Sequence, residues 1–236
     1  MCIRDRISYL RFLRELTWGN NDDGISNNPD CTIIAVEVLA VSSRLSPPPL
    51  VRSRFITALS RILAVHDIDK FSVVSHSYGT VLAAHVVHSA TLSPRLHSLV
   101  LVDPVSILLH MPSVAVNFTR RPPRRANEWQ LWYFAAKDPG IAECLSRWFF
   151  WRYNILWRSD IEDMIAQGKR VAVFLAGKDL IVDAPTVYEY LSDVDGLDLV
   201  IMDRLDHSQV FDKTEQMMVI KAVRDFIRSG PRQVVG

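Results

Sequence analysis

The stretch FSVVSHSYG, residues 71–79, joins an apolar run to a helix-forming run through a turn of small residues. Phe71 to Ser75 is short and rich in apolar residues, which predicts a buried strand, and Tyr78 to Ser89 predicts a helix with small residues on its face. Residues 96–102, LHSLVLV, predict a second strand that Asp103 and Pro104 close. Strand, sharp turn, helix and strand together form the βαβ unit of a parallel sheet.

The same pattern extends on both sides of this unit. Downstream, strands are predicted over residues 170–176 and 197–202, with helices around 185–191 and 213–227. Upstream, the sequence predicts a helix over 7–16, a loop over 20–30, a strand over the β-branched run 32–40 and a helix over 51–66. The predicted fold class is therefore α/β, with a mostly parallel sheet flanked by helices.

Residues 105–168 differ from the rest because they show no strand alternation and hold five of the six tryptophans. A helical reading is favoured, interrupted at Pro122-Pro123 and at Asp138-Pro139-Gly140. We therefore predict a helical cap over residues 105–168, inserted into a core made of residues 1–104 and 169–236.

Ser75-His76-Ser77-Tyr78-Gly79 matches the small-x-Ser-x-Gly pattern of a nucleophile elbow, with Ser in place of the usual first Gly. A strained turn between strand and helix exposes the serine oxygen at the carboxyl edge of the sheet, and small neighbours two residues away permit it. Ser77 is the predicted nucleophile. The helix that begins there directs its amides at a developing oxyanion, so we expect the Tyr78 N–H to be one donor.

The base can be sought by position, because a base must reach the serine from the same sheet edge. His85 and His88 lie in the helix after Ser77, His97 begins a strand, and His110 lies in the insertion. His207 follows the last predicted strand in a loop at that edge, and it comes after Ser77 and the acid, as the triad order of this architecture requires. His207 is the predicted base.

Three aspartates at strand ends are candidates for the acid that fixes the tautomer of His207. Asp179 follows residues 170–176, Asp103 ends the strand after the elbow helix, and Asp203 stands close to His207. Asp179 is preferred and Asp103 is the alternative. The competing interpretation of Asp103-Pro104 is a turn that ends a strand.

The blocks SVVSHSYG, LVLVDP, VFLAGKDLIV and LDHSQVF resemble those of the α/β-hydrolase family, in that family's order, over residues 31–230. The resemblance implies a Ser77–Asp179–His207 triad that hydrolyses an ester, thioester or amide through an acyl-enzyme, without metal or organic cofactor. We expect a serine hydrolase of carboxylic esters. An acyltransferase or thioesterase with the same triad, or a non-catalytic binding protein of this fold, are the alternatives.

The chain departs from the family pattern at its start. The family has a strand and a loop with the second oxyanion donor before the helix that residues 7–16 resemble. We therefore expect the first strands and that donor to be missing from this chain. Because one oxyanion donor contributes about a hundred- to a thousand-fold in rate, the chain is expected to be weakly active.

The charge and cysteine content of the chain limit the kinds of molecule that we expect it to bind. The net charge of +1 gives no field that attracts nucleic acid, so we expect no such partner. Cys2, Cys31 and Cys144 are too few and too scattered for a disulfide framework or a zinc site. No run is long enough to span a membrane, and the charged start, residues 1–6, does not resemble a signal peptide. These features do not indicate the compartment, and a cytoplasmic or membrane-associated location is our expectation.

The aromatic cap has three interpretations. It can form an acyl-binding tunnel for a lipophilic ester, since ligand pockets are mostly apolar. It can also lie against a membrane surface, where tryptophan and tyrosine concentrate and where arginines such as Arg120, Arg121, Arg124 and Arg125 would suit phospholipid. The third interpretation is that the aromatics are the core of the cap and the arginines a solvated loop. The sequence does not indicate an oligomeric state.

Overall fold

The computed structural model describes residues 6–18, 32–42, 44, 46–212 and 214–229. Four strands form one sheet: β1 (Phe71–His76), β2 (Leu96–Val102), β3 (Arg170–Ala176) and β4 (Asp198–Met202). All neighbouring pairs are parallel and the strands lie in sequence order, with Ser75 opposite Leu101 and Leu101 opposite Val173. The predicted parallel sheet is confirmed, and each strand lies within two residues of its predicted bounds.

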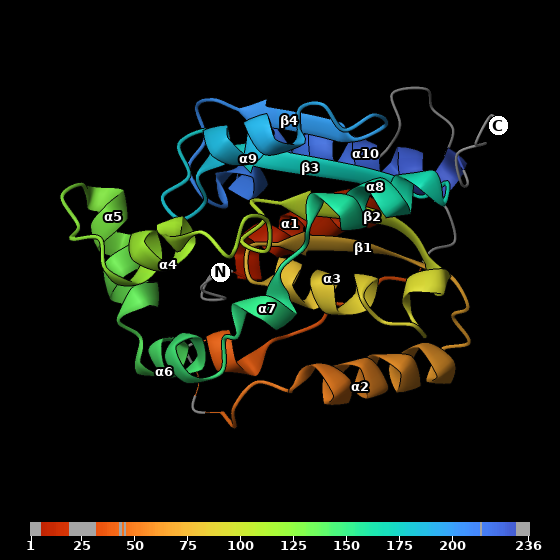
Figure 1. Cartoon of the computed structure of the whole chain (residues 1–236), viewed down its shortest axis with the longest axis horizontal. Coiled ribbons are helices and arrows are strands. Elements are labelled where there is room, and N and C mark those ends of the chain that lie inside the picture. The colour runs from red at the N-terminus through yellow and green to blue at the C-terminus, as the bar shows by residue number, and fades with distance from the viewer. Residues whose placement is uncertain (1–5, 19–31, 43, 45, 213, 230–236) are drawn as a thin grey trace.

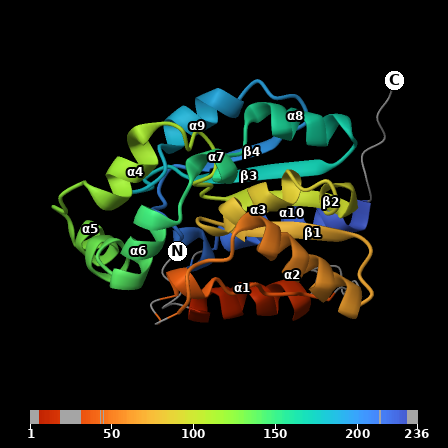
Figure 2. The ribbon, with the colours of Figure 1, turned by 60° about the horizontal axis from the view of Figure 1, so that its bottom comes forward.

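Helices cover both faces of the sheet (Figures 1 and 2). Side chains of a strand alternate between faces, so Leu99 and Leu101 point to one layer and Val100 and Val102 to the other. The first layer contains α2 (Arg52–Val65), α3 (Gly79–Val87), α8 (Arg158–Ala166) and α9 (Ala184–Leu191). The second contains α1 (Arg6–Trp18) and α10 (Gln216–Ser229). The sheet is therefore buried on both faces, as apolar strands of a parallel sheet require.

The prediction of a strand over residues 32–40 is wrong. Residues 32–38 have no regular structure and are mostly exposed, and Leu39–Val41 form one 3-10 turn, η2. A β-branched run becomes a strand only beside a hydrogen-bonding neighbour, because strand preference reflects packing on a sheet. In the described part of the chain, the sheet ends at β1 and no strand lies beside this run. The loop predicted over 20–30 lies outside the described residues.

The segment between β2 and β3 is helical, as predicted. It contains α4 (Pro112–Thr119), α5 (Ala126–Leu131), a π-helical turn η4 (Trp132–Ala136), α6 (Pro139–Arg147), α7 (Trp151–Asn154) and α8. Pro122-Pro123 separates α4 from α5, and Asp138 caps α6 by accepting a hydrogen bond from the Ile141 amide at 3.0 Å. Both predicted interruptions are therefore confirmed.

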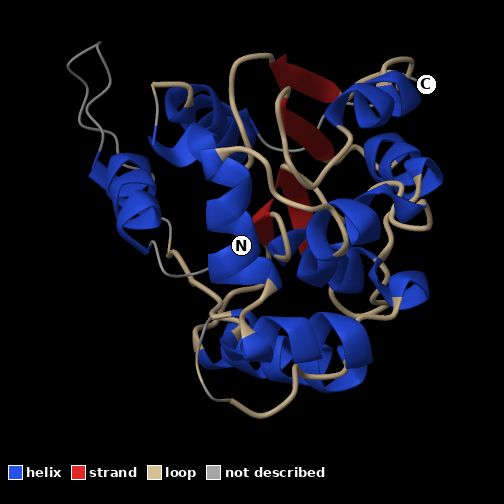
Figure 3. Ribbon diagram, turned by 90° about the vertical axis from the view of Figure 1, so that its left-hand side faces the viewer, coloured by secondary structure: helices blue, strands red, loops and turns tan. Residues whose placement is uncertain are grey.

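Helices α4, α5 and α6 lie beyond the end of the sheet at which its strands terminate (Figure 1). Viewed from that side, helices and loops lie in front of the strands (Figure 3). The last helix of this segment behaves differently. Ile161 and Met164 of α8 are buried in the layer that packs on Val173. The segment thus begins as a covering over the sheet's end and finishes as part of the layer on its face.

Candidate active site

A sharp turn places Ser77 between β1 and α3. Ser77 has a φ of 51°, a left-handed conformation that costs energy for a residue with a side chain. Backbone contacts hold it, because the Ser77 amide donates to the Val102 carbonyl at 3.0 Å and the Thr80 hydroxyl donates to the Ser77 carbonyl at 2.6 Å. A Cβ placed on Gly79 would lie 3.7 Å from the Ser75 Cβ, an ordinary contact. Serine at position 75 is therefore accommodated in this turn.

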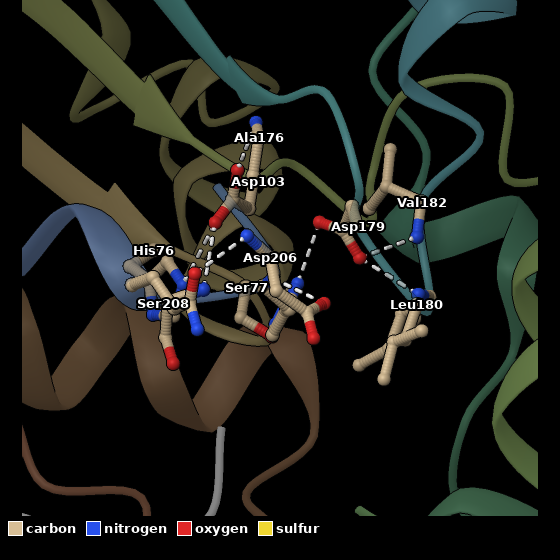
Figure 4. Close-up of polar contacts among 12 residues, drawn as sticks. His76, Ser77, Asp103, Ala176, Asp179, Leu180, Val182, Asp206 and Ser208 are labelled. Carbon is tan, nitrogen blue, oxygen red and sulfur yellow. Dashed lines mark hydrogen bonds and ion pairs between the residues drawn. The ribbon is translucent and has the colours of Figure 1, made fainter. Parts of the chain in front are cut away.

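The structure brings Ser77, His207 and Asp179 together from three loops at the sheet's end. Figure 4 shows Ser77 and Asp179 within this site. The Ser77 Oγ lies 2.8 Å from His207 Nε2, and His207 Nδ1 lies 2.7 Å from the Asp179 Oδ2. A carboxylate only accepts, so Nδ1–H donates to Asp179 and Nε2 is left to accept the serine proton. This is the tautomer a general base requires.

The loop around Asp179 holds its carboxylate in place. Its second oxygen, Oδ1, accepts hydrogen bonds from the amides of Ile181 at 2.7 Å and Val182 at 3.0 Å. Asp179 and His207 are almost fully buried, and Ser77 is 2% exposed. The three side chains of this chain of contacts are therefore largely shielded from solvent.

Two opposing influences set the pKa of His207. Burial lowers this pKa, because a charged imidazole loses its hydration. The charge and hydrogen bond of Asp179, with the charge of Asp103, outweigh burial and hold the pKa above its usual 6.5. The imidazolium is thus stabilised in place.

Asp103, the alternative acid, lies at the end of β2 and is fully buried. Its Oδ1 accepts from the Ala176 amide at 2.8 Å and its Oδ2 from the Ser208 amide at 2.9 Å. Burial raises its pKa, but the contact with His76, the influence of His207 and the hydrogen bond from the Ser208 amide outweigh burial and lower it. Asp103 therefore ties β2 to β3 and to the residue after His207, while Asp179 bonds to the imidazole.

His76 and Tyr9 extend this buried network, and no pattern in the sequence indicates their contact. The Tyr9 hydroxyl lies 2.6 Å from His76 Nδ1, and His76 Nε2 lies 3.5 Å from the Asp103 Oδ2. Burial lowers the pKa of His76 to about 4, although Asp103 opposes the shift. His76 is thus neutral, accepts from Tyr9 and directs Nε2–H at Asp103.

His76, Asp103 and His207 are also the residues that come nearest to a metal site among those described. One ligand atom from each lies within 4.8 Å of the others. Their hydrogen bonds to Tyr9, to backbone amides and to Asp179 account for the arrangement without an ion.

The other histidines that follow Ser77 are engaged elsewhere. His85 contacts Asn154 at 3.0 Å, His88 contacts Asp160 at 2.9 Å, and His97 contacts the Phe226 carbonyl at 3.0 Å. The ring of His110 lies near those of Trp151 and Trp157, with centroids 6.4 and 5.2 Å away. Asp203, the third acid candidate, is exposed, and its backbone passes so close to Gly177 that a Cβ there would lie 2.6 Å from the Asp203 Cα.

Tyr78 is the N-cap residue of helix α3 and directly follows Ser77. Its amide is among those that a helix start leaves without a carbonyl of its own helix, which suits the predicted oxyanion role. Its hydroxyl lies 3.8 Å from the Sγ of the buried Cys144, on α6, and its ring packs near Phe149. Burial raises the pKa of this phenol, so Tyr78 is a neutral contact between elbow and cap.

A mostly apolar cavity of about 290 Å³ lies between α4 and α9. Its lining includes Ile107, Met111, Val182 and Val187, with Asn117 and Thr186 among the polar groups. Ser77 and His207 are not part of the lining. The cavity adjoins the site through Val182, whose amide bonds to Asp179.

Comparison of the sequence with protein-family models and with curated protein sequences finds no match. Solved structures do match. A hydrolase from Oleispira antarctica is 14% identical with a TM-score of 0.58, over 95% of this chain and 89% of that one. A membrane phospholipase A is 13% identical with a TM-score of 0.55, over 95% and 76%. A meta-cleavage product hydrolase from Pseudomonas fluorescens is 15% identical with a TM-score of 0.54, over 77% and 75%.

These likenesses, together with the parallel sheet and its helical layers, show that the chain has the α/β-hydrolase fold. No helix in the described ranges is both long and apolar enough to cross a bilayer.

Proposed function

We propose that this chain is a serine hydrolase that cleaves carboxylic esters through an acyl-enzyme, with Ser77 as nucleophile, His207 as base and Asp179 as acid. One observation carries the proposal: an unbroken chain of hydrogen bonds from Ser77 Oγ through His207 to Asp179, at 2.8 and 2.7 Å. It begins at a strained serine between strand and helix, which is how this fold presents a nucleophile.

In the first step, Ser77 Oγ attacks the ester carbonyl while His207 Nε2 takes the serine proton. Asp179 stabilises the imidazolium that forms. The tetrahedral intermediate then collapses, its C–O bond breaks, and His207 returns the proton to the leaving alcohol. Water repeats the sequence on the acyl-enzyme and releases the acid and free Ser77.

The oxyanion of that intermediate needs donors that are in place before the reaction. The Tyr78 amide at the start of α3 is the proposed donor from this chain. One donor fewer costs about a hundred- to a thousand-fold in rate, so a low rate is expected if no second donor is present.

Three observations favour a lipophilic ester. The cavity beside the Asp179 loop is lined mainly by apolar side chains, which suits a hydrocarbon chain. Tyr78, Cys144 and Phe149 place further apolar surface next to the elbow. A membrane phospholipase A is among the solved structures that share the fold.

The test is labelling with a fluorophosphonate probe, which reacts with an activated serine hydroxyl. We expect the wild-type chain to be labelled and Ser77→Ala and His207→Ala to be unlabelled. His66→Ala, which changes an exposed histidine at the end of α2, is the matched control and should label normally. Labelling that persists in Ser77→Ala would contradict the proposal.

If the chain is labelled, the next question is which molecule accepts the acyl group from Ser77. Release of acid from p-nitrophenyl esters in water alone supports a hydrolase, whereas product that forms only with an added alcohol or thiol indicates an acyltransferase. A folded wild-type chain that neither reacts with the probe nor turns over an ester would favour a binding protein of this fold.

We further propose that the cap rests on an anionic lipid surface. Residues 111–157 hold seven arginine and lysine residues against three acidic ones, in a chain of net charge +1. The same segment exposes large aromatic side chains, each 40–66% accessible: Trp129, Tyr133, Phe134, Trp148, Phe150, Trp151, Tyr153 and Trp157. Exposed apolar surface with basic side chains fits the interface of an anionic bilayer.

Flotation with vesicles tests this surface. The Ser77→Ala chain should float with phosphatidylglycerol vesicles and remain behind with phosphatidylcholine vesicles, because basic side chains favour anionic headgroups. The double variants Trp129→Ala/Tyr133→Ala and Phe150→Ala/Tyr153→Ala should lose binding. Tyr188→Ala removes an exposed aromatic outside the cap and is the control. Equal flotation of all variants, or a cap that instead pairs two chains in solution, would contradict the proposal.

A further inference from the structure

Three polar side chains of the cap reach across to the two loops that carry Asp179 and His207. Asn117 lies on α4, Arg121 follows α4, and Asn127 lies on α5. They are 59 to 79 residues away in sequence from their partners. All three contacts fall within two residues of the proposed acid or base.

Two of the contacts hold the acid loop. Asn117 Nδ2 donates to the Ile181 carbonyl at 3.1 Å, and Arg121 Nη2 donates to the Leu180 carbonyl at 2.6 Å. Ile181 thus takes part in two contacts, because its carbonyl accepts from Asn117 while its amide donates to Asp179. The turn after Asp179 is therefore held by two sets of hydrogen bonds. Its amides donate to the Asp179 carboxylate, and its carbonyls accept from side chains of the cap.

The third contact holds the base loop. Asn127 Nδ2 donates to the Asp206 Oδ2 at 2.6 Å, and the Asp206 Oδ1 accepts from the His207 amide at 2.7 Å. Asp206 thus joins the cap to the backbone of the base itself. The Gln209 side chain accepts from the Asp206 amide at 3.0 Å and completes the loop.

The two loops also meet directly, through the Lys178 amide and the Leu205 carbonyl at 2.8 Å. That bond fixes their backbones at one point. The cap contacts add three further points, at Leu180, Ile181 and Asp206, each within two residues of Asp179 or His207.

We propose that Asn117, Arg121 and Asn127 are positioning residues, through which the cap holds the acid and base loops in the geometry that lets Asp179, His207 and Ser77 bond in sequence. This rests on the proposed function, because it assigns a role within the same site. Errors of about 1 Å in such a geometry cost on the order of a hundred-fold in rate, so a contact that touches no substrate can matter for catalysis. In this arrangement, a movement of the cap also changes the position of His207 relative to Ser77 and Asp179.

The experiment measures the fluorophosphonate labelling rate against pH for Asn117→Ala, Arg121→Ala, Asn127→Ala and the triple variant. Each single variant should label about three- to tenfold more slowly, as expected for one lost hydrogen bond, and the triple variant more slowly still. Arg121→Lys keeps one donor and should recover part of the rate. Arg54→Ala removes an exposed arginine of α2, outside the cap, and should match the wild type.

A merely structural role would leave the titration of His207 unchanged, so its pKa is measured by NMR in the same variants, with His207→Ala to identify the signal. The groups that face His207 are Asp179, Asp103 and His76. Loosening the Asp179 contact should lower the His207 pKa toward 6.5, with the fold retained by circular dichroism. If Arg121→Ala fails to fold, Asn127→Ala decides, because its contact is exposed.

Wild-type labelling rates and an unchanged His207 pKa in all the variants would overturn the inference. A wild-type chain that is never labelled would overturn the proposed function instead. The NMR titration needs no reaction, so it still reports on the cap contacts in that event.

Discussion

The sheet and the cap are built in opposite ways. Leu99, Leu101, Val173 and Leu175 in β2 and β3 are completely buried, between layers of helices that are 8 to 14 residues long. The cap helices α4 to α7 are four to nine residues long, and many of their aromatic rings face solvent. Short helices draw little stability from their own hydrogen bonds and depend on tertiary contacts. The sheet can therefore fix the nucleophile by packing, whereas the cap reaches the site through a few polar contacts.

The largest effect should come from matched truncations in the two regions. Leu101→Ala removes a fully buried side chain and should lower the free energy of unfolding by about 2–5 kcal/mol. Phe150→Ala removes a ring that is 58% exposed and should change it by no more than about 0.5 kcal/mol. Urea denaturation measures both. Equal losses would mean that the cap aromatics form a core of their own.

Glycine-to-alanine substitutions should have opposite effects on stability in the two regions. Gly177→Ala would bring a Cβ to 2.6 Å from the Asp203 Cα, so the backbone leading to His207 must shift, at a cost of about 1–3 kcal/mol. Gly140→Ala, in α6 of the cap, meets nothing closer than 3.4 Å and should stabilise the helix by up to about 1 kcal/mol. Thermal unfolding of the two variants should move in opposite directions.

Lowering the pH should first remove the contribution to folding stability of His76, the buried last residue of β1. His76 has a pKa lowered to about 4, so its contribution to stability is present above 6.5 and is lost as the pH falls toward 4. His207 has a raised pKa, so its contribution is present below 6.5 and is lost as the pH rises through the raised value. Because the base must be neutral, labelling of Ser77 should rise with a midpoint above 6.5. Asp179→Asn should lower that midpoint, and an unchanged midpoint would refute the Asp179 assignment.

The smallest effect should come from the surface between the cap segment and the core. Arg158 of α8 forms ion pairs with Glu162 at 2.6 Å and with Asp193 at 2.5 Å, both with partly exposed partners. Solvent screens such pairs, so Arg158→Ala should leave the free energy of unfolding nearly unchanged, and the small difference should shrink further in high salt. A larger loss in urea denaturation would show that this contact anchors α8.

The same contrast explains what the sequence could predict. Residues 96–102 and 170–176 are apolar throughout, so their strands followed from local pattern, and the positions of Ser77 and His207 followed from the strand ends. The run 32–40 carries an equally strong β pattern, but a strand needs a neighbour and the described sheet offers none. The contacts of Tyr9 with His76 and of Arg121 with Leu180 join residues far apart in the chain, and no spacing within the sequence marks them.

The uneven distribution of tryptophan gives the two regions separate spectroscopic signatures. Five of the six indoles lie between residues 129 and 157, and several are half exposed. Intrinsic emission excited at the indole band is thus chiefly a report on the cap, while far-ultraviolet dichroism reports on helices and strands throughout the chain. Melting curves followed by the two signals will coincide if cap and sheet unfold as one cooperative unit, and will separate if the cap comes loose first.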